Sequence, residues 1–171
     1  MKVFFIIIAF SLSLIGSDLL KVHRKLVPMI LLQVKDIAKK KNKIIKILIV
    51  ANTNELLIAQ ELKELIPKKI KYFDIKTSIL EESNINELWV LNYDAIYAFS
   101  LSKKTYDMIN QISLKDKIVT FSNSNIGLKS GMLVFIDKKK KINIYMNFKT
   151  MKQLKIPFNS KFLSIVKFVN E

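Results

Sequence analysis

Hydrophobic and polar positions change their period several times along the chain, and each change predicts a new element. From Asp18 to Lys40, apolar residues recur every three or four positions, which predicts an amphipathic helix that Pro28 kinks or splits. Residues 44–50 (IIKILIV) form a nearly continuous β-branched run, typical of a strand buried on both faces of a parallel sheet. A second amphipathic helix is expected over 56–66, where Pro67 ends it.

The same alternation continues toward the C-terminus. We expect strands at 70–75, 95–99 and 117–121, helices at 84–92 and 103–112, a loop at 123–131, a hairpin of 132–136 with 142–146, and a helical end. Strands that alternate with helices predict an α/β fold. The chain is therefore expected to form a single-domain sandwich with a mostly parallel central sheet, helices on both faces and a C-terminal β-hairpin edge.

The N-terminus has the layout of a secretory signal peptide. Lys2 is followed by an apolar run from Val3 to Ile15 and then by small and polar residues at 16–18. The run is shorter than the roughly 20 residues that a transmembrane helix needs. We therefore expect residues 1–17 to be a signal peptide and 18–171 to be the mature domain in the periplasm. A buried N-terminal strand and an uncleaved anchor are the alternatives.

The charge of the chain suggests a polyanionic partner, but its composition weakens that interpretation. The formal net charge is +15, yet Arg24 is the only arginine, and Arg is the residue that nucleic-acid recognition favours. Abundant Lys, Ile and Asn are what an AT-rich genome encodes most readily. With a periplasmic address, we expect no nucleic-acid partner and at most a weak attraction to an anionic membrane surface.

Few residues could carry chemistry. The chain has no cysteine, which excludes disulfides and thiolate metal sites, and His23, the only histidine, is expected to be a surface or packing residue. The nucleophile-elbow, dinucleotide-binding and P-loop patterns are all missing. Glu81 and Glu82 are adjacent, so they should point in different directions. We therefore expect a protein that is not an enzyme and that has no metal and no cofactor.

Small neutral side chains follow the three strands that we expect to be buried. They are Asn52, Thr53 and Asn54, then Ser100 and Ser102, then Ser122, Asn123 and Ser124. In an open α/β sheet, ligands bind beyond the carboxyl ends of the strands, so these residues could line the rim of a pocket for a ligand or partner. The alternative is ordinary turn and helix-capping chemistry, which favours the same residue types.

The last third of the chain resembles the YfiR family of periplasmic regulators. The resemblance rests on the turn Gly131-Met132, the strand-end Asn147, the helix close LKI at 154–156, Pro157 between the last helices, and Ser160 with Leu163 in the final helix. The strand YDAIYAFS at 93–100 also fits the family. The chain departs from it in having no cysteines and in replacing the usual aromatic N-terminal helix with LLKVHRKLVPMILLQV.

The resemblance implies a function by binding. Family members repress the periplasmic part of an inner-membrane signalling protein, typically a diguanylate cyclase that makes cyclic-di-GMP, and others accompany histidine kinases. The resemblance thus implies a non-enzymatic regulator of such a partner, and family analogy leaves a homodimer open. The alternative is a small periplasmic ligand-binding module related to solute-binding proteins, and a charge-driven nucleic-acid or membrane-surface binder is a third hypothesis.

Overall fold

The computed structural model describes residues 18–85, 93–138 and 141–170, and these form one mixed sheet flanked by helices. The strands are β1 (Ile44–Ala51), β2 (Lys69–Ile70), β3 (Phe73–Glu81), β4 (Ala95–Ala98), β5 (Val119–Ser122), β6 (Val134–Lys138), β7 (Ile142–Asn147) and β8 (Lys167–Val169). They are arranged in the order β2-β3-β1-β4-β5-β6-β7-β8. The run from β3 to β6 is parallel, and β2 and β7 pair antiparallel with β3 and β6. This confirms the predicted α/β fold with its mostly parallel sheet.

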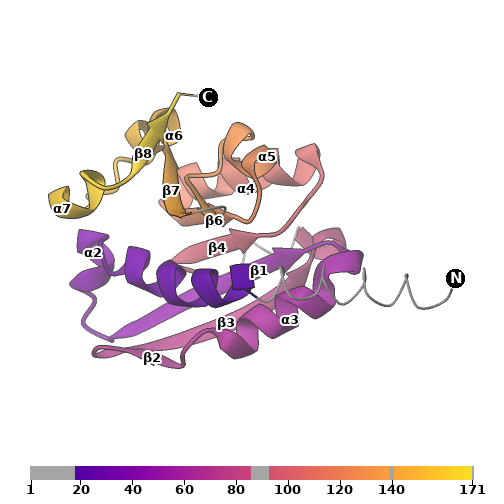
Figure 1. The fold of residues 1–171 in the computed structure, drawn as a ribbon, viewed down its shortest axis with the longest axis horizontal. Coiled ribbons are helices and arrows are strands. Elements are labelled where there is room, and N and C mark those ends of the chain that lie inside the picture. The colour runs from indigo at the N-terminus through magenta and orange to yellow at the C-terminus, as the bar shows by residue number, and fades with distance from the viewer. Residues whose placement is uncertain (1–17, 86–92, 139–140, 171) are drawn as a thin grey trace, which may run out of the picture.

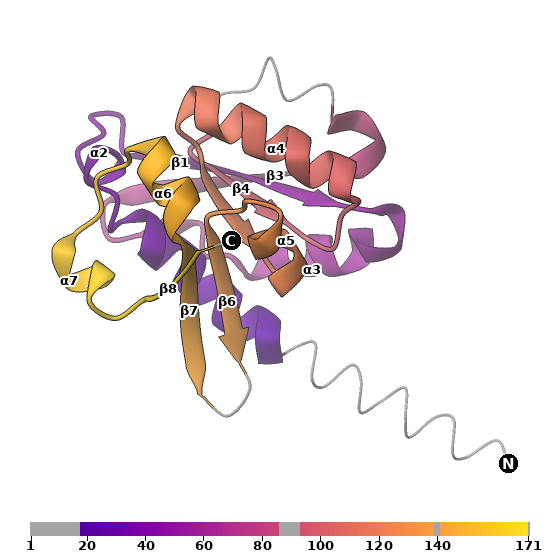
Figure 2. The ribbon, with the colours of Figure 1, turned by 90° about the horizontal axis from the view of Figure 1, so that it is seen from above.

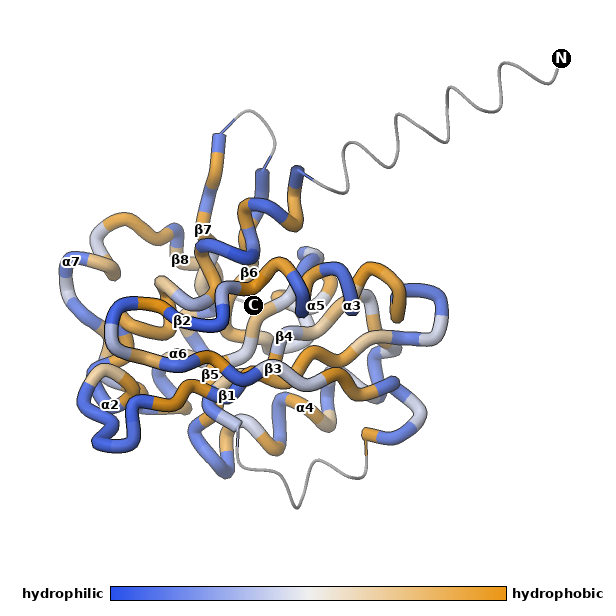
Figure 3. The backbone as a smooth tube through the Cα atoms, turned by 90° about the horizontal axis from the view of Figure 1, so that it is seen from below, coloured by the Kyte–Doolittle hydropathy of each residue, from blue (hydrophilic) through white to orange (hydrophobic). Residues whose placement is uncertain are grey.

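Helices cover both faces of the sheet (Figures 1 and 2). An N-terminal helix spans residues 18–31, and residues 82–85 form a 3-10 turn. The others are α2 (Lys35–Ala38), the 3-10 helix η1 (Thr53–Glu55), α3 (Leu56–Leu65), α4 (Lys103–Asp116), α5 (Asn125–Lys129), α6 (Phe148–Leu154) and α7 (Ser160–Leu163). The turns around α2 and β2 are hydrophilic (Figure 3), in keeping with their lysines.

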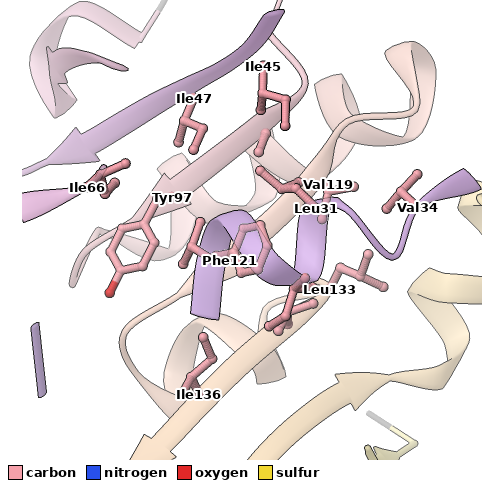
Figure 4. Packing of buried hydrophobic residues seen from close by; sticks show 14 of the residues in the cluster. Leu31, Val34, Ile45, Ile47, Ile66, Tyr97, Val119, Phe121, Leu133 and Ile136 are labelled. Carbon is pink, nitrogen blue, oxygen red and sulfur yellow. The ribbon is translucent and has the colours of Figure 1, made fainter. Parts of the chain in front are cut away.

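The alternation of side chains along β1 divides the core into two clusters. Ile47 and Ile49 face a large cluster with the N-terminal helix and α3, whereas Leu48 and Val50 face a smaller one with α4. Figure 4 shows part of the large cluster, where Leu31 of the N-terminal helix lies among side chains of several strands. Because every β1 side chain from Ile47 to Ala51 is buried, β1 is the doubly covered strand that its β-branched run predicts.

Several predicted boundaries are wrong, and tertiary pairing explains most of them. The strand expected at 70–75 is β3 at Phe73–Glu81, whose central residues are half-buried because the strand lies next to the short edge strand β2. The chain end is not wholly helical, since Lys167–Val169 pairs with β7 as β8. The predicted loop at 123–131 contains α5, and α4 continues to Asp116, where Lys117 closes it in the left-handed conformation with φ 54°.

The N-terminal helix also differs from its prediction. It runs through Pro28 without a break and ends at residue 31, because a proline this near the helix end removes only one of the last backbone hydrogen bonds. The signal peptide predicted at residues 1–17 and most of the helix predicted at 84–92 lie outside the described residues. In the part of the chain that the structure describes, no helix is long and apolar enough to cross a membrane.

Asn147 connects the end of β7 to the loop before β6. Its Oδ1 accepts from the backbone N–H of Thr150 at 3.0 Å, which caps α6, and its Nδ2 donates to the Leu128 carbonyl at 3.1 Å. Thr150 Oγ1 donates to the Gly131 carbonyl at 2.9 Å. Gly131 has φ +94°, and a Cβ there would lie 2.5 Å from Asn110 Nδ2, so only glycine fits. The Gly-Met turn and the strand-end Asn are thus one hydrogen-bonded structure.

The final helical turn begins at Ser160, in agreement with the placement of Ser160 and Leu163 in the final helix. Asn159 is the N-cap of α7, with its side chain accepting from Lys161 N at 2.9 Å. The Pro157 carbonyl accepts from Lys35 N at 2.9 Å, which fixes α2 against the segment before α7. Pro157 therefore marks a contact between the two ends of the domain as well as a helix break.

His23 of the N-terminal helix forms a buried hydrogen-bonded pair with Tyr97 of β4. His23 Nε2 lies 3.1 Å from the Ile136 carbonyl, so this nitrogen carries the proton, and Nδ1 accepts from the Tyr97 hydroxyl. Burial lowers the pKa of His23 to about 4, although the hydrogen bond to the Ile136 carbonyl acts in the opposite direction. Burial raises the pKa of Tyr97. The histidine is a packing residue, as its sequence context predicts.

Replacing Asn147 by Leu should lower the free energy of unfolding by about 2 kcal/mol, since the buried Leu128 carbonyl and the Thr150 N–H both lose their partner. Denaturant unfolding measures this change. The matched control is Asn159→Ala, which removes an exposed cap and should cost less than about 1 kcal/mol. Equal losses in the two variants would contradict the interpretation.

Lowering the pH should destabilise the protein through His23. Because the folded-state pKa of about 4 lies below the ordinary 6.5, the folded state binds this proton less readily than the unfolded chain. The contribution of neutral His23 to the free energy of unfolding is complete above pH 6.5. About 3 kcal/mol of this contribution is lost as the pH falls to about 4. Urea unfolding of the wild type and of His23→Gln across this range measures it. The wild type should lose stability more steeply, and parallel pH profiles would refute the prediction.

Candidate functional site

The carboxyl edge of the parallel strands contains a topological switch point between β1 and β4. The chain leaves β1 through α3 to β3 on one side, and leaves β4 through α4 to β5 on the other. The loops after β1 and β4 therefore diverge, and such a divergence is where open α/β sheets bind ligands. Asn52 follows β1 and Ser100 follows β4, so the first two groups of predicted rim residues meet at this point.

Asn52 joins the two loops. Its Nδ2 donates to the Ser100 carbonyl at 2.6 Å and to Glu55 Oε2 at 3.0 Å. Its Oδ1 accepts from the Glu55 backbone N–H at 3.1 Å, which caps η1. One amide side chain thus fixes the start of η1 and the end of β4, and the crevice between β1 and β4 is closed at this level.

Two carboxylates, Glu81 and Glu82, complete the rim, a position that the sequence did not predict for them. Thr53 Oγ1 donates to Glu81 at 2.6 Å, whereas Glu82 accepts from Ser102 N at 2.8 Å and from Thr105 Oγ1 at 2.6 Å. Burial alone would raise the pKa of Glu82, but the hydrogen bonds from Thr105 and Ser102 outweigh it and lower the pKa. Glu82 therefore remains ionised and holds the N-terminus of α4 against the loop after β3.

The loop after β5 forms the third part of the rim. Ser122 Oγ donates to the Ser124 carbonyl at 2.9 Å and accepts from Ser124 N at 3.1 Å. Ser124 is in turn the N-cap of α5, through a bond from Gly127 N. The two serines thus form the turn itself, and this leaves Asn123 between them as the side chain that is free of turn formation.

Asn123 lines a pocket of about 290 Å³ beside the β6–β7 hairpin. The other lining residues come from the start of the N-terminal helix and from β6: Asp18, Leu19, Phe135, Ile136, Asp137 and Lys138. The hairpin extends past this edge of the sheet, so it stands as a wall next to the loop after β5 (Figure 2). Asn123 Oδ1 is buried and accepts no hydrogen bond from the described residues.

The chemistry of this pocket is that of binding. Its lining combines Asn123, Asp137 and Phe135, a set of side chains suited to a small ligand with hydroxyl or amine donors. Lys138 Nζ lies 3.3 Å from Asp18, and this hydrogen bond lowers the pKa of the Asp18 carboxyl. Within the described residues, no group of three or more His, Asp or Glu side chains is placed to hold a metal ion.

The predicted rim residues therefore fall into two groups. Asn52, Ser102 and Ser124 are helix N-caps, Asn54 is exposed in η1, and Thr53, Ser100 and Ser122 take part in the hydrogen bonds between and within the loops. Only Asn123 lines the pocket. The sequence offers no local signal that Phe135 and Asp137 line a pocket, because the same pattern of residues occurs in a hairpin strand without a binding site.

A second depression lies at the amino edge of the sheet, where Lys40 and Asp94 form an ion pair. It has a volume of about 290 Å³ and is bordered by Lys40 and Asp94. The Asp94 carboxylate accepts from Lys40 Nζ at 2.8 and 2.9 Å and from Lys46 N at 2.9 Å. Since the central carboxylate already has three hydrogen bonds, this edge is the weaker candidate.

Comparison with known proteins finds similar α/β folds among solved structures. No protein-family model matches the chain, and no curated protein matches it in sequence. A conserved domain protein from Vibrio cholerae matches in structure with a TM-score of 0.61 and 14% identity, over 87% of this chain and 59% of that one.

Two further solved structures are similar. One is a substrate-binding protein with adhesive properties from Clostridium difficile, in its ligand-free open form, with a TM-score of 0.56 and 16% identity over 74% of this chain and 54% of that one. The other is an ABC domain in complex with L-Trp from Streptococcus pneumoniae, with a TM-score of 0.56 and 12% identity over 82% of this chain and 62% of that one. The chain thus spans between about half and three fifths of the proteins it matches, and at this identity the likeness shows the fold alone.

Replacing Glu82 by Gln should loosen the rim, because the amide is a weaker acceptor for the Ser102 N–H and the Thr105 hydroxyl. We expect a loss of about 1 kcal/mol in unfolding free energy at pH 7 and faster amide exchange at Ser102. Since the folded pKa of Glu82 is lowered, the difference should shrink as the pH falls through that pKa. Glu61→Gln, on the exposed side of α3, is the control and should change neither quantity. A Glu82→Gln effect that is the same at pH 3 and pH 7 would refute the role of the carboxylate.

Proposed function

We propose that the chain is a small ligand-binding module of the substrate-binding class, which takes its ligand at the carboxyl edge of the sheet. The observation that carries the proposal is the pocket at Asn123, which lies beyond β5 and β6 at the same carboxyl edge as the switch point between β1 and β4. Its orphan amide oxygen, its carboxylate and its aromatic ring are the groups that fix a small polar ligand.

The rim supports the proposal by being preorganised. Asn52, Glu81 and Glu82 hold the loops after β1, β3 and β4 through short hydrogen bonds within the chain. A ligand that binds to a fixed edge loses less affinity to the ordering of loops. These rim residues thus act mainly as the frame of the carboxyl edge, and the pocket at Asn123, farther along this edge, is the contact surface.

The fold of the similar proteins agrees with this function, and one of them is a substrate-binding protein by name. An extracytoplasmic location would suit such a module, and it rests on the signal peptide expected at residues 1–17. The repression of a diguanylate cyclase or a histidine kinase rests on the YfiR resemblance alone and stays a prediction.

The test is a thermal-shift and calorimetry screen of the full chain against free L-amino acids and simple sugars. At least one compound should raise the melting temperature in a saturable way, and Asn123→Leu should weaken its binding at least tenfold, because the amide acceptor is lost. Asn125→Leu is the matched control, because Asn125 is exposed on the neighbouring α5. This variant should bind the compound with the affinity of the wild type. A screen without a saturable binder, or equal affinities in the two variants, would contradict the proposal.

A further inference from the structure

A second, apolar pocket lies away from the carboxyl edge. Its volume is about 250 Å³, and it is lined by Leu26, Met29, Ile30 and Gln33 of the N-terminal helix region, Ile144 of β7, and Lys161, Phe162 and Ile165 around α7. Three separate elements thus form its walls. It is a concave site and not merely the bare face of one helix.

Two large apolar side chains that line the pocket are exposed to solvent. Met29 is 52% exposed and Ile165 is 69% exposed, whereas the neighbouring Ile30 and Phe162 are buried. Burying Met29 and Ile165 against a ligand would remove exposed apolar surface from water, which favours binding.

The walls are held at a fixed separation. Asn159 N donates to the Gln33 carbonyl at 2.8 Å, and Lys35 N donates to the Pro157 carbonyl at 2.9 Å. Val34 and Phe158 form an antiparallel bridge between these two bonds. Figure 1 shows the result, with α7 lying beside α2 and the end of the N-terminal helix. The pocket is therefore preformed, which spares a ligand the cost of ordering it.

Gln33 and Lys161 are the polar residues of the lining, and each is near in the chain to the bond between Asn159 N and the Gln33 carbonyl. The Gln33 side chain donates to the Met29 carbonyl at 3.2 Å. Lys161 is the charged residue of the lining, and no carboxylate is found among the described residues that line the pocket. The site thus has a cationic, hydrogen-bonding end and an apolar body.

We propose that this pocket binds one single-chain amphiphile with an anionic head, such as a medium-chain carboxylate. The alkyl chain lies against Leu26, Ile144 and Ile165, and the carboxylate lies at Lys161 and Gln33. The pattern of charge selects the head group, because an ammonium head would meet Lys161 without a neutralising partner in the lining. The inference is independent of the ligand-binding function proposed for the carboxyl edge.

The experiment follows methyl resonances of the full chain during titration with monomeric decanoate, decanol and decylammonium. Decanoate should produce saturable shifts at Leu26, Ile144 and Ile165, with decanol weaker and decylammonium weakest. Lys161→Gln should weaken decanoate about threefold and leave decanol unchanged, as expected of a partly exposed ion pair.

A matched pair of surface variants locates the site. Ile165→Glu should weaken decanoate at least tenfold, since it places a carboxylate at the rim. Ile126→Glu is the control, because Ile126 is 67% exposed, close to the 69% of Ile165, and lies on α5 outside the pocket. Both positions are exposed, so both variants should fold.

Three results would overturn the proposal. They are no saturable shift with decanoate, equal effects of the two Glu variants, and decylammonium binding as tightly as decanoate. Anionic phospholipid vesicles form a separate arm. Vesicle binding that Ile165→Glu abolishes, in a protein that does not bind monomeric decanoate, would refute the single-ligand site and favour a membrane-surface contact.

Discussion

The double burial of β1 is the constraint on which the rest of the structure depends. A parallel strand that is apolar on both faces cannot be left open to water, so each face needs its own helical cover. The side of Ile47 and Ile49 is covered by the N-terminal helix and α3, and the side of Leu48 and Val50 by α4. The chain can meet this demand only if its connections leave β1 and β4 in opposite directions. That divergence creates the switch point at the carboxyl edge.

The N-terminal helix covers the sheet through a polar contact as well as an apolar one. His23 belongs to this helix, and its two ring nitrogens contact Tyr97 of β4 and the Ile136 carbonyl of β6. A neutral imidazole with one donor and one acceptor satisfies both at once. An apolar residue there would leave the Tyr97 hydroxyl and the Ile136 carbonyl unpaired in the core, so the pair fixes the position of the helix on the sheet.

The sequence was sufficient wherever the signal is local. The β-branched run of residues 44–50 predicts β1, and the Asn and Ser residues before helices are consistent with caps, as Asn52 and Ser102 show. Prediction from the sequence failed where a residue's contact partner is distant in the chain. Nothing near Phe168 predicts β8, whose pairing depends on β7, and nothing near Phe135 or Glu82 reveals a neighbour in another loop. Such contacts arise from register and from loop direction, which periodicity does not encode.

The two pockets share the N-terminal helix, and this raises the question of whether they are coupled. Asp18 lines the first near the helix start, while Leu26 and Met29 line the second near its end. Coupling would require two alternative positions of the helix, each favoured by one ligand. The contacts of His23 oppose this, because any slide of the helix along its axis would separate His23 from Tyr97 and Ile136 within the core. The helix therefore acts as a rigid wall common to both pockets, and occupation of one pocket should leave the other unchanged.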